Sequence, residues 1–195
     1  MRHRWFAVAA ATALPGSAHA HSAIEGIDAF YGGLLHPYVV PEHLLSLIAL
    51  GLLVGTMGWR QYRIGIPAFL MALLAGLGLG AAGVLPVFPQ QVLLVLAMIC
   101  GAGAALTLPT KALLLAVPGV IVGAVIGLDS VPEDFAETQA WSVLGATAVG
   151  AGIVPAYLGA LLIRFRREWL RLATRIAGSW VVAASLLVLS LVVFR

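Results

Sequence analysis

The chain has 195 residues, of which 62% are hydrophobic and only 10% are charged, and its formal net charge is +3. Soluble domains carry roughly 25% charged residues, so this composition excludes an ordinary soluble protein and indicates an all-α integral membrane protein with one bundle. The positive charge does not indicate nucleic-acid binding, because the basic residues lie in a leader and in predicted cytoplasmic loops. Cys100 is the single cysteine and lies in an apolar segment, which excludes a disulfide framework.

Residues 1–20 have the pattern of a cleavable signal peptide. Basic residues at the start precede an apolar run over 5–14, and Ala18-His19-Ala20 forms an A-x-A cleavage site. The run is too short for a membrane helix, which needs about 20 residues. Cleavage after Ala20 would place a free amine beside the imidazole of His21. That pair can chelate a metal ion, although a histidine after a cleavage site can also be incidental.

The mature chain, 21–195, contains six apolar stretches separated by charged or proline-containing turns. Each is long enough for a membrane helix, and residues 21–40 before them form a periplasmic N-terminal segment. The predicted spans are 41–58, 64–84, 90–107, 111–128, 139–163 and 175–194.

Loop charges predict the orientation, because cytoplasmic loops collect Lys and Arg. The first, third and fifth loops hold the basic residues Arg60, Arg63, Lys111, Arg164, Arg166, Arg167, Arg171 and Arg175. The second loop has no charge, and the fourth carries Asp129, Glu133, Asp134 and Glu137. Both mature termini are therefore predicted to be periplasmic. Trp59, Trp141 and Trp169 lie near span ends, as an interfacial aromatic belt requires.

Glycines recur every fourth residue on two spans. Gly119, Gly123 and Gly127 lie on the fourth span, and Gly76 and Gly80 lie on the second. Small residues let helix backbones approach closely in lipid, so we expect packing seams. The alternative is a smooth lining for a permeation path.

The segment before the first span carries the candidate chemistry. Residues 24–35 have apolar side chains at roughly helical spacing, with Glu25 and Asp28 between them, which predicts a short amphipathic helix on the outer surface. Pro37 restricts the connection that follows, and Pro41 suits the first position of the first span, where its missing N–H costs nothing.

His36, Glu42 and His43 lie within eight residues at this outer interface, in a chain dominated by Val, Leu and Ala. Two imidazoles and a carboxylate are ligands that suit a divalent transition metal such as nickel, cobalt, copper or zinc, so we predict a metal site here. Alternatives exist for each residue. Glu42 can simply complement the helix dipole, and an interfacial histidine can be an amphipathic filler.

The leader, the six spans and the string His36-Pro37-Tyr38-Val39-Val40-Pro41-Glu42-His43 resemble the HupE/UreJ family of bacterial membrane proteins. The family's first signature is a histidine, five residues, then Asp-His at the start of the first mature span. His36 and His43 match it, with Glu42 in place of Asp. The resemblance implies a nickel or cobalt permease of the inner membrane that serves hydrogenase and urease.

The family's second signature is a His-Gly-x-x-His-Gly pattern in the fourth span, followed by an acidic residue. The corresponding residues here are Val122, Gly123, Ile126, Gly127 and Asp129, so the glycines and the acid are kept and the histidines are missing. Asp129 therefore joins His21 as a secondary ligand candidate. A captured ion would have to pass along backbone carbonyls or hydroxyls such as those of Ser46, Thr56, Thr107 and Ser142.

Two functions follow from these features. The first is uptake of nickel or cobalt after capture at the periplasmic site. The alternative is a non-transporting membrane subunit that presents metal to a metalloenzyme or maturation partner, or scaffolds it. An enzyme is not expected, because the sequence has no HExxH pattern, no Gly-x-Ser-x-Gly elbow and no acid–base pair within the spans.

Overall fold

A computed structural model describes residues 29–107, 112–131, 140–165 and 167–194, and all regular secondary structure in these ranges is helical. The helices are α2 (Ala29–Val39), α3 (Pro41–Met57), α4 (Trp59–Ala81), α5 (Pro89–Leu106), α6 (Ala112–Asp129), α7 (Ala140–Arg164) and α8 (Glu168–Val193). The predicted all-α fold is confirmed. The leader, His21, Glu25 and Asp28 lie outside the described residues.

Helices α3 to α8 occupy the places of the six predicted spans. Four of them, α4, α5, α7 and α8, are long and apolar enough to cross a membrane. A fifth span results if α2 and α3, which meet at an angle of 71°, are counted as one broken span. In α6, the part over Ala116–Asp129 forms a shorter apolar helix. The chain is therefore a multi-pass membrane protein, and the number of six spans stays a prediction.

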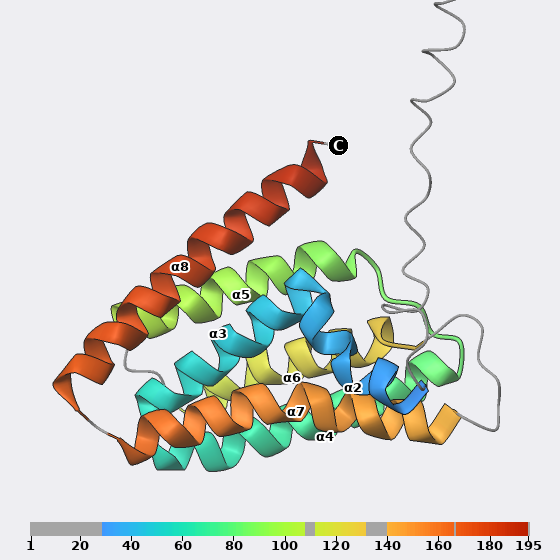
Figure 1. Cartoon of the computed structure of the whole chain (residues 1–195), viewed down its shortest axis with the longest axis horizontal. Coiled ribbons are helices and arrows are strands. Elements are labelled where there is room, and N and C mark those ends of the chain that lie inside the picture. Colours follow the sequence, from blue (N-terminus) through green and yellow to red (C-terminus); the bar gives the residue numbers. More distant parts are fainter. Residues whose placement is uncertain (1–28, 108–111, 132–139, 166, 195) are drawn as a thin grey trace, which may run out of the picture.

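The long helices run side by side and alternate in direction, except that α8 leans away from the bundle toward its C-terminus (Figure 1). This alternation separates the charges. The end of the bundle at the left of Figure 1, where α4 and α8 begin, carries Arg60, Arg63, Arg164, Arg167, Arg171 and Arg175. The opposite end carries the α2–α3 junction and the last residue of α6, Asp129.

Glycines hold α4 and α6 together, as predicted. A Cβ atom on Gly76 would collide with the Ala124 carbonyl of α6, and one on Gly123 would collide with the Phe69 carbonyl of α4. A Cβ on Gly127 would lie 2.7 Å from the Leu77 nitrogen. Because no other residue type allows this backbone approach, the seam prediction is confirmed for the α4–α6 contact.

Glycine pairs also bring α2 against α7 and α5 against α8. A Cβ on Gly33 of α2 would lie 2.6 Å from the Val143 carbonyl, and one on Gly150 of α7 would collide with the Leu34 carbonyl. Gly101 and Gly178 face each other in the same way across α5 and α8. The described part of the segment before the first span is therefore helical and packs against α7, with Phe30 and Tyr31 exposed. Its predicted place on the outer surface of the membrane stays a prediction.

The bundle interior is aliphatic. Side chains from α3, α4, α5, α6 and α7 form one buried cluster, which comprises Leu47, Leu50, Val54, Ile66, Phe69, Leu73, Leu77, Leu93, Leu96, Val122, Ile126, Leu144 and Ala151. A second buried cluster joins α3, α5 and α8 and includes Cys100, which is fully buried as a free thiol. Dispersion contacts in these two clusters therefore hold the five long helices around α3.

One residue connects α3 to α4. Gly58 has φ 101° and ψ −177°, a conformation that is essentially restricted to glycine. The helix α4 then begins at Trp59, earlier than the predicted start at 64, because Arg60 and Arg63 continue the helix beyond its apolar part. Arginine is a good helix former, so the charged residues end the hydrophobic stretch without ending the helix.

Candidate metal centre

The bend between α2 and α3 brings two histidines, His36 and His43, into contact. Val40 at the junction is extended, with φ −92° and ψ 111°, and Pro41 occupies the first turn of α3 as expected. The two helices meet at 71°, and the rings of His36 on α2 and His43 on α3 lie with centroids 5.4 Å apart and planes at 70°. The predicted proximity of His36 and His43 is therefore present in the fold.

Two hydrogen bonds to neighbouring helix backbones fix α2 beside this junction. The Tyr38 hydroxyl donates to the Gly150 carbonyl at 2.5 Å, and the Thr147 hydroxyl donates to the Gly33 carbonyl at 3.1 Å. Both bonds join α2 to α7. Neither Tyr38 nor Thr147 stands out in the sequence, because a positioning role of this kind depends on a contact between segments more than 100 residues apart.

Asp129 reaches the same place from the end of α6. Its Oδ2 lies 3.0 Å from Nε2 of His43, whose side chain is fully buried, while the Asp129 side chain is 29% exposed. A carboxylate at the C-terminal end of a helix is opposed by the helix dipole. The contact with the imidazole N–H supplies the stabilisation that this position requires.

The two histidines keep one free nitrogen each. Within the described residues, Nδ1 of His43 and Nε2 of His36 are buried and have no hydrogen-bond partner. Leaving a buried polar atom unpaired costs about 1–3 kcal/mol, so two such atoms in adjacent rings need an explanation. If Nε2 of His43 carries the proton and donates it to Asp129, the lone pair on Nδ1 is available to a cation.

The ring centroids lie at a spacing that both an edge-to-face ring contact and a shared metal ion allow. Imidazole nitrogens bind such ions at about 2.0–2.1 Å, and two imidazoles at a tetrahedral angle then have ring centroids roughly 5 Å apart. The observed 5.4 Å is close to this value. The pairing of His43 with Asp129 also matches a common arrangement of metal-bound histidines, in which the second ring nitrogen donates to a carboxylate.

Glu42 does not join this group. It is 9% exposed in the first turn of α3, and in the described part of the chain it forms no hydrogen bond or ion pair with His36 or His43. Successive residues of a helix point about 100° apart, so Glu42 and His43 lie on different faces. The negative charge in this position complements the positive end of the α3 dipole.

Three converging ligands are not in place in the described part of the chain. There, no group of three or more His, Cys, Asp and Glu side chains is arranged to hold a metal ion. What the structure does bring together is His43 with His36 on one side and with Asp129 on the other. The two rings provide two unpaired nitrogens, and the carboxylate of Asp129 orients His43. His21 lies outside the described residues.

The interior below the histidines is closed by apolar side chains. Val122 and Ile126, at the positions of the missing second signature, are fully buried in the main aliphatic cluster. The hydroxyl of Ser46, one turn into the bundle from His43, donates to the Leu93 carbonyl at 2.9 Å, and that of Thr56 donates to Leu53 within its own helix. The Ser46 hydroxyl thus joins α3 to α5, whereas the Thr56 hydroxyl is bonded inside α3.

Comparison with known proteins agrees with the motif. The sequence profile of the HupE / UreJ protein family matches residues 9–188. One similar protein is Protein HupE of Rhizobium leguminosarum bv. viciae, which is 35% identical over 91 residues, covering 46% of this chain and 47% of that protein. The matched region thus spans about half the length of this relative. No solved structure matches the chain. Because the family profile covers nearly the whole chain, this membrane protein belongs to the HupE/UreJ family.

Proposed function

We propose that the chain captures a divalent transition-metal ion, nickel or cobalt, at the His36–His43 pair and serves its uptake across the bacterial inner membrane. The observation that carries this proposal is the pair of buried, unpaired imidazole nitrogens in adjacent rings. Membership of the HupE/UreJ family supports the choice of nickel or cobalt, because imidazole alone also suits copper and zinc.

The electrostatic setting supports a cation at this place. Asp129 supplies a full negative charge beside His43, and the C-terminal end of α6 adds the negative end of a helix dipole. Among the described residues, the arginines of α4, α7, α8 and the α7–α8 corner lie at the far end of the bundle, so they do not oppose a cation here. The remaining ligand positions would be filled by water, by Glu42 after a side-chain rotation, or by His21.

The test is metal binding by purified protein. Nickel and cobalt titrations by calorimetry should show one site in the unchanged chain and none in a variant with both His36→Ala and His43→Ala. A control outside the site is Glu168→Ala, since Glu168 lies in the first turn of α8, at the arginine-bearing end of the bundle. Equal nickel binding by the double variant and the unchanged chain would refute the site.

A second function has its own supporting observation. The aliphatic cluster beneath His43 contains Val122 and Ile126 where a second pair of ligands would be needed for a path. A membrane subunit that holds metal and presents it to a metalloenzyme partner needs only the outer site. Nickel uptake into liposomes that contain this chain alone separates the two functions, because a presenting subunit binds the ion at the surface without accumulating it inside.

A further inference from the structure

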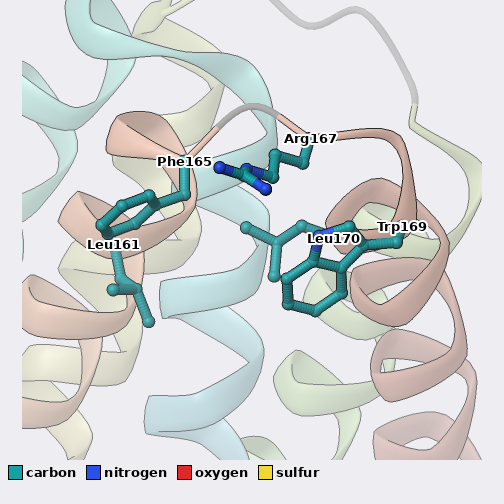
Figure 2. Close-up of a pocket in the computed structure, with 5 residues that line it drawn as sticks. All are labelled: Leu161, Phe165, Arg167, Trp169 and Leu170. Atoms are coloured by element: carbon teal, nitrogen blue, oxygen red, sulfur yellow. The ribbon is translucent and has the colours of Figure 1, made fainter.

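The corner between α7 and α8 encloses a pocket at the arginine-bearing end of the bundle, far from the histidines. Its volume is about 270 Å³, and Leu161, Phe165, Arg167, Trp169 and Leu170 line it. Figure 2 shows the Arg167 side chain extended across the top of the pocket, with Leu161 and Phe165 on one side and Leu170 and Trp169 on the other. The pocket is thus lined by one cationic side chain and four largely apolar ones.

The size and charge of the pocket restrict what can occupy it. Pockets for drug-sized ligands measure roughly 300–1,000 Å³, so this pocket suits a fragment the size of a phosphate-bearing headgroup. The Arg167 guanidinium presents a planar set of donors that matches phosphate oxygens. The guanidinium carbon of Arg164 lies 5.8 Å from the centre of the Phe165 ring, and Arg164 itself does not line the pocket. An anionic group in the pocket therefore meets one cation, Arg167.

The surface beyond the pocket is apolar and continuous with it. Trp169, Leu172, Ile176 and Trp180 lie on one face of α8, and each is at least half exposed. At 1.5 Å per residue this stripe is about 16 Å long, which is close to half of the roughly 30 Å hydrocarbon core of a bilayer. A phosphate-sized pocket that leads into an apolar stripe of this length has the two-part shape of a phospholipid.

We propose that the α7–α8 corner is a binding site for an anionic phospholipid, with the headgroup phosphate at Arg167 and an acyl chain along the Trp169–Trp180 face of α8. Basic pockets between membrane helices are known to hold phosphate headgroups of such lipids. Trp169 stands at the boundary between the two parts, the position that interfacial tryptophans prefer. A lipid bound in this pocket would contact both α7 and α8. It would thereby hold α8 near α7, although α8 leans away from the bundle toward its C-terminus (Figure 1).

The affinity test uses the full chain in neutral detergent, with bound lipid measured by native mass spectrometry. Cardiolipin with oleoyl chains should bind the unchanged chain, and Arg167→Gln should weaken it roughly fivefold, the factor for one basic side chain at an anionic surface. Arg60→Gln is the matched control, because Arg60 is exposed at the same end of the bundle and lies outside the pocket. Arg167→Lys should keep most of the binding.

A fluorescence test locates the acyl chain and does not depend on the arginine variants. Cardiolipin with brominated chains, added at one equivalent, should quench tryptophan fluorescence less in Trp169→Phe than in the unchanged chain. Trp141→Phe should leave the absolute loss of emission unaltered, because Trp141 lies in the first turn of α7 at the opposite end of the bundle.

Three results would overturn the proposal. Equal loss of cardiolipin in Arg60→Gln and Arg167→Gln would reduce the effect to surface charge. Binding of oleoyl phosphatidylcholine as tight as that of cardiolipin would remove the role of the anion. Displacement of cardiolipin by millimolar inorganic phosphate would assign the pocket to a soluble anion.

Discussion

The glycine seam between α4 and α6 predicts opposite changes in stability for the same substitution at two positions of α4. Gly76 and Gly78 both lie in α4, but a Cβ on Gly76 would collide with the Ala124 carbonyl, whereas a Cβ on Gly78 would meet nothing within 4 Å. We therefore compare Gly76→Ala with Gly78→Ala. The two variants add the same methyl group to the same helix, so only the surroundings differ.

The magnitude follows from two opposing terms. Alanine gains about 0.8–1.0 kcal/mol of helix propensity over glycine at either position. At position 76 the new methyl must push the two helices apart, and overpacking of this kind costs about 1–3 kcal/mol. A gap of about 0.5–1 Å between the two helices also removes a quarter to a half of the dispersion energy of each affected contact. Gly76→Ala should therefore destabilise the bundle by about 2 kcal/mol, while Gly78→Ala should stabilise it by up to about 1 kcal/mol.

The measurement is thermal unfolding in detergent, followed by helical circular dichroism. For a chain of this size 1 kcal/mol corresponds to roughly 2–4 °C in Tm, so Gly76→Ala should melt about 4–8 °C lower and Gly78→Ala up to about 4 °C higher. Equal melting temperatures of the two variants would refute the seam. A Gly76→Ala variant of normal stability that binds nickel but no longer takes it up would favour the alternative of a permeation lining.

Three further changes test the site and its support. Asp129→Asn should weaken nickel binding about 10–100-fold in calorimetry, as expected for the loss of a carboxylate that orients a bound histidine; abolished binding, as in His43→Ala, would show that Asp129 is itself a ligand. Gly58→Ala should lower Tm, because its backbone conformation costs other residues about 1–3 kcal/mol, and an unchanged Tm would contradict that strain. Val122→His combined with Ile126→His should lower Tm by burying two unpaired imidazoles. Nickel should raise Tm again if the two rings form a second metal-binding site. No recovery with nickel would favour the presenting function.

The sequence predicts the helices well because hydrophobicity determines them. The apolar stretches locate α3 to α8, but hydropathy marks only the part of a helix that prefers lipid. The predicted start of the last span at 175 is therefore late, since α8 begins at Glu168 and includes Arg171. A helix continues through such residues for as long as its backbone hydrogen bonds can form.

The candidate site was predictable only in part. The string around the first span predicts that His36 and His43 lie together, because both flank one short turn. It also suggests Glu42 as a third ligand, but Glu42 and His43 are neighbours on α3 and face different directions, so Glu42 forms no hydrogen bond or ion pair with the two rings in the described conformation. The contact that orients His43 joins it to Asp129, 86 residues away. The pattern of the second signature indicates Asp129 as a secondary ligand candidate, but neither motif predicts that Asp129 contacts His43.

The position of the site within the fold restricts how uptake could operate. An ion at His36 and His43 has polar partners on its outer side only, because Leu47, Val122 and Ile126 close the interior next to it. Moving a divalent ion into that cluster would remove its ligands and its water together, which costs several kcal/mol for each charge. In the conformation described, the ion therefore stops at the depth of His43. If the chain transports the ion, uptake requires a second conformation. Asp129, which contacts His43 of α3 from the end of α6, is the group through which a bound ion would bias a movement of α6 relative to α3.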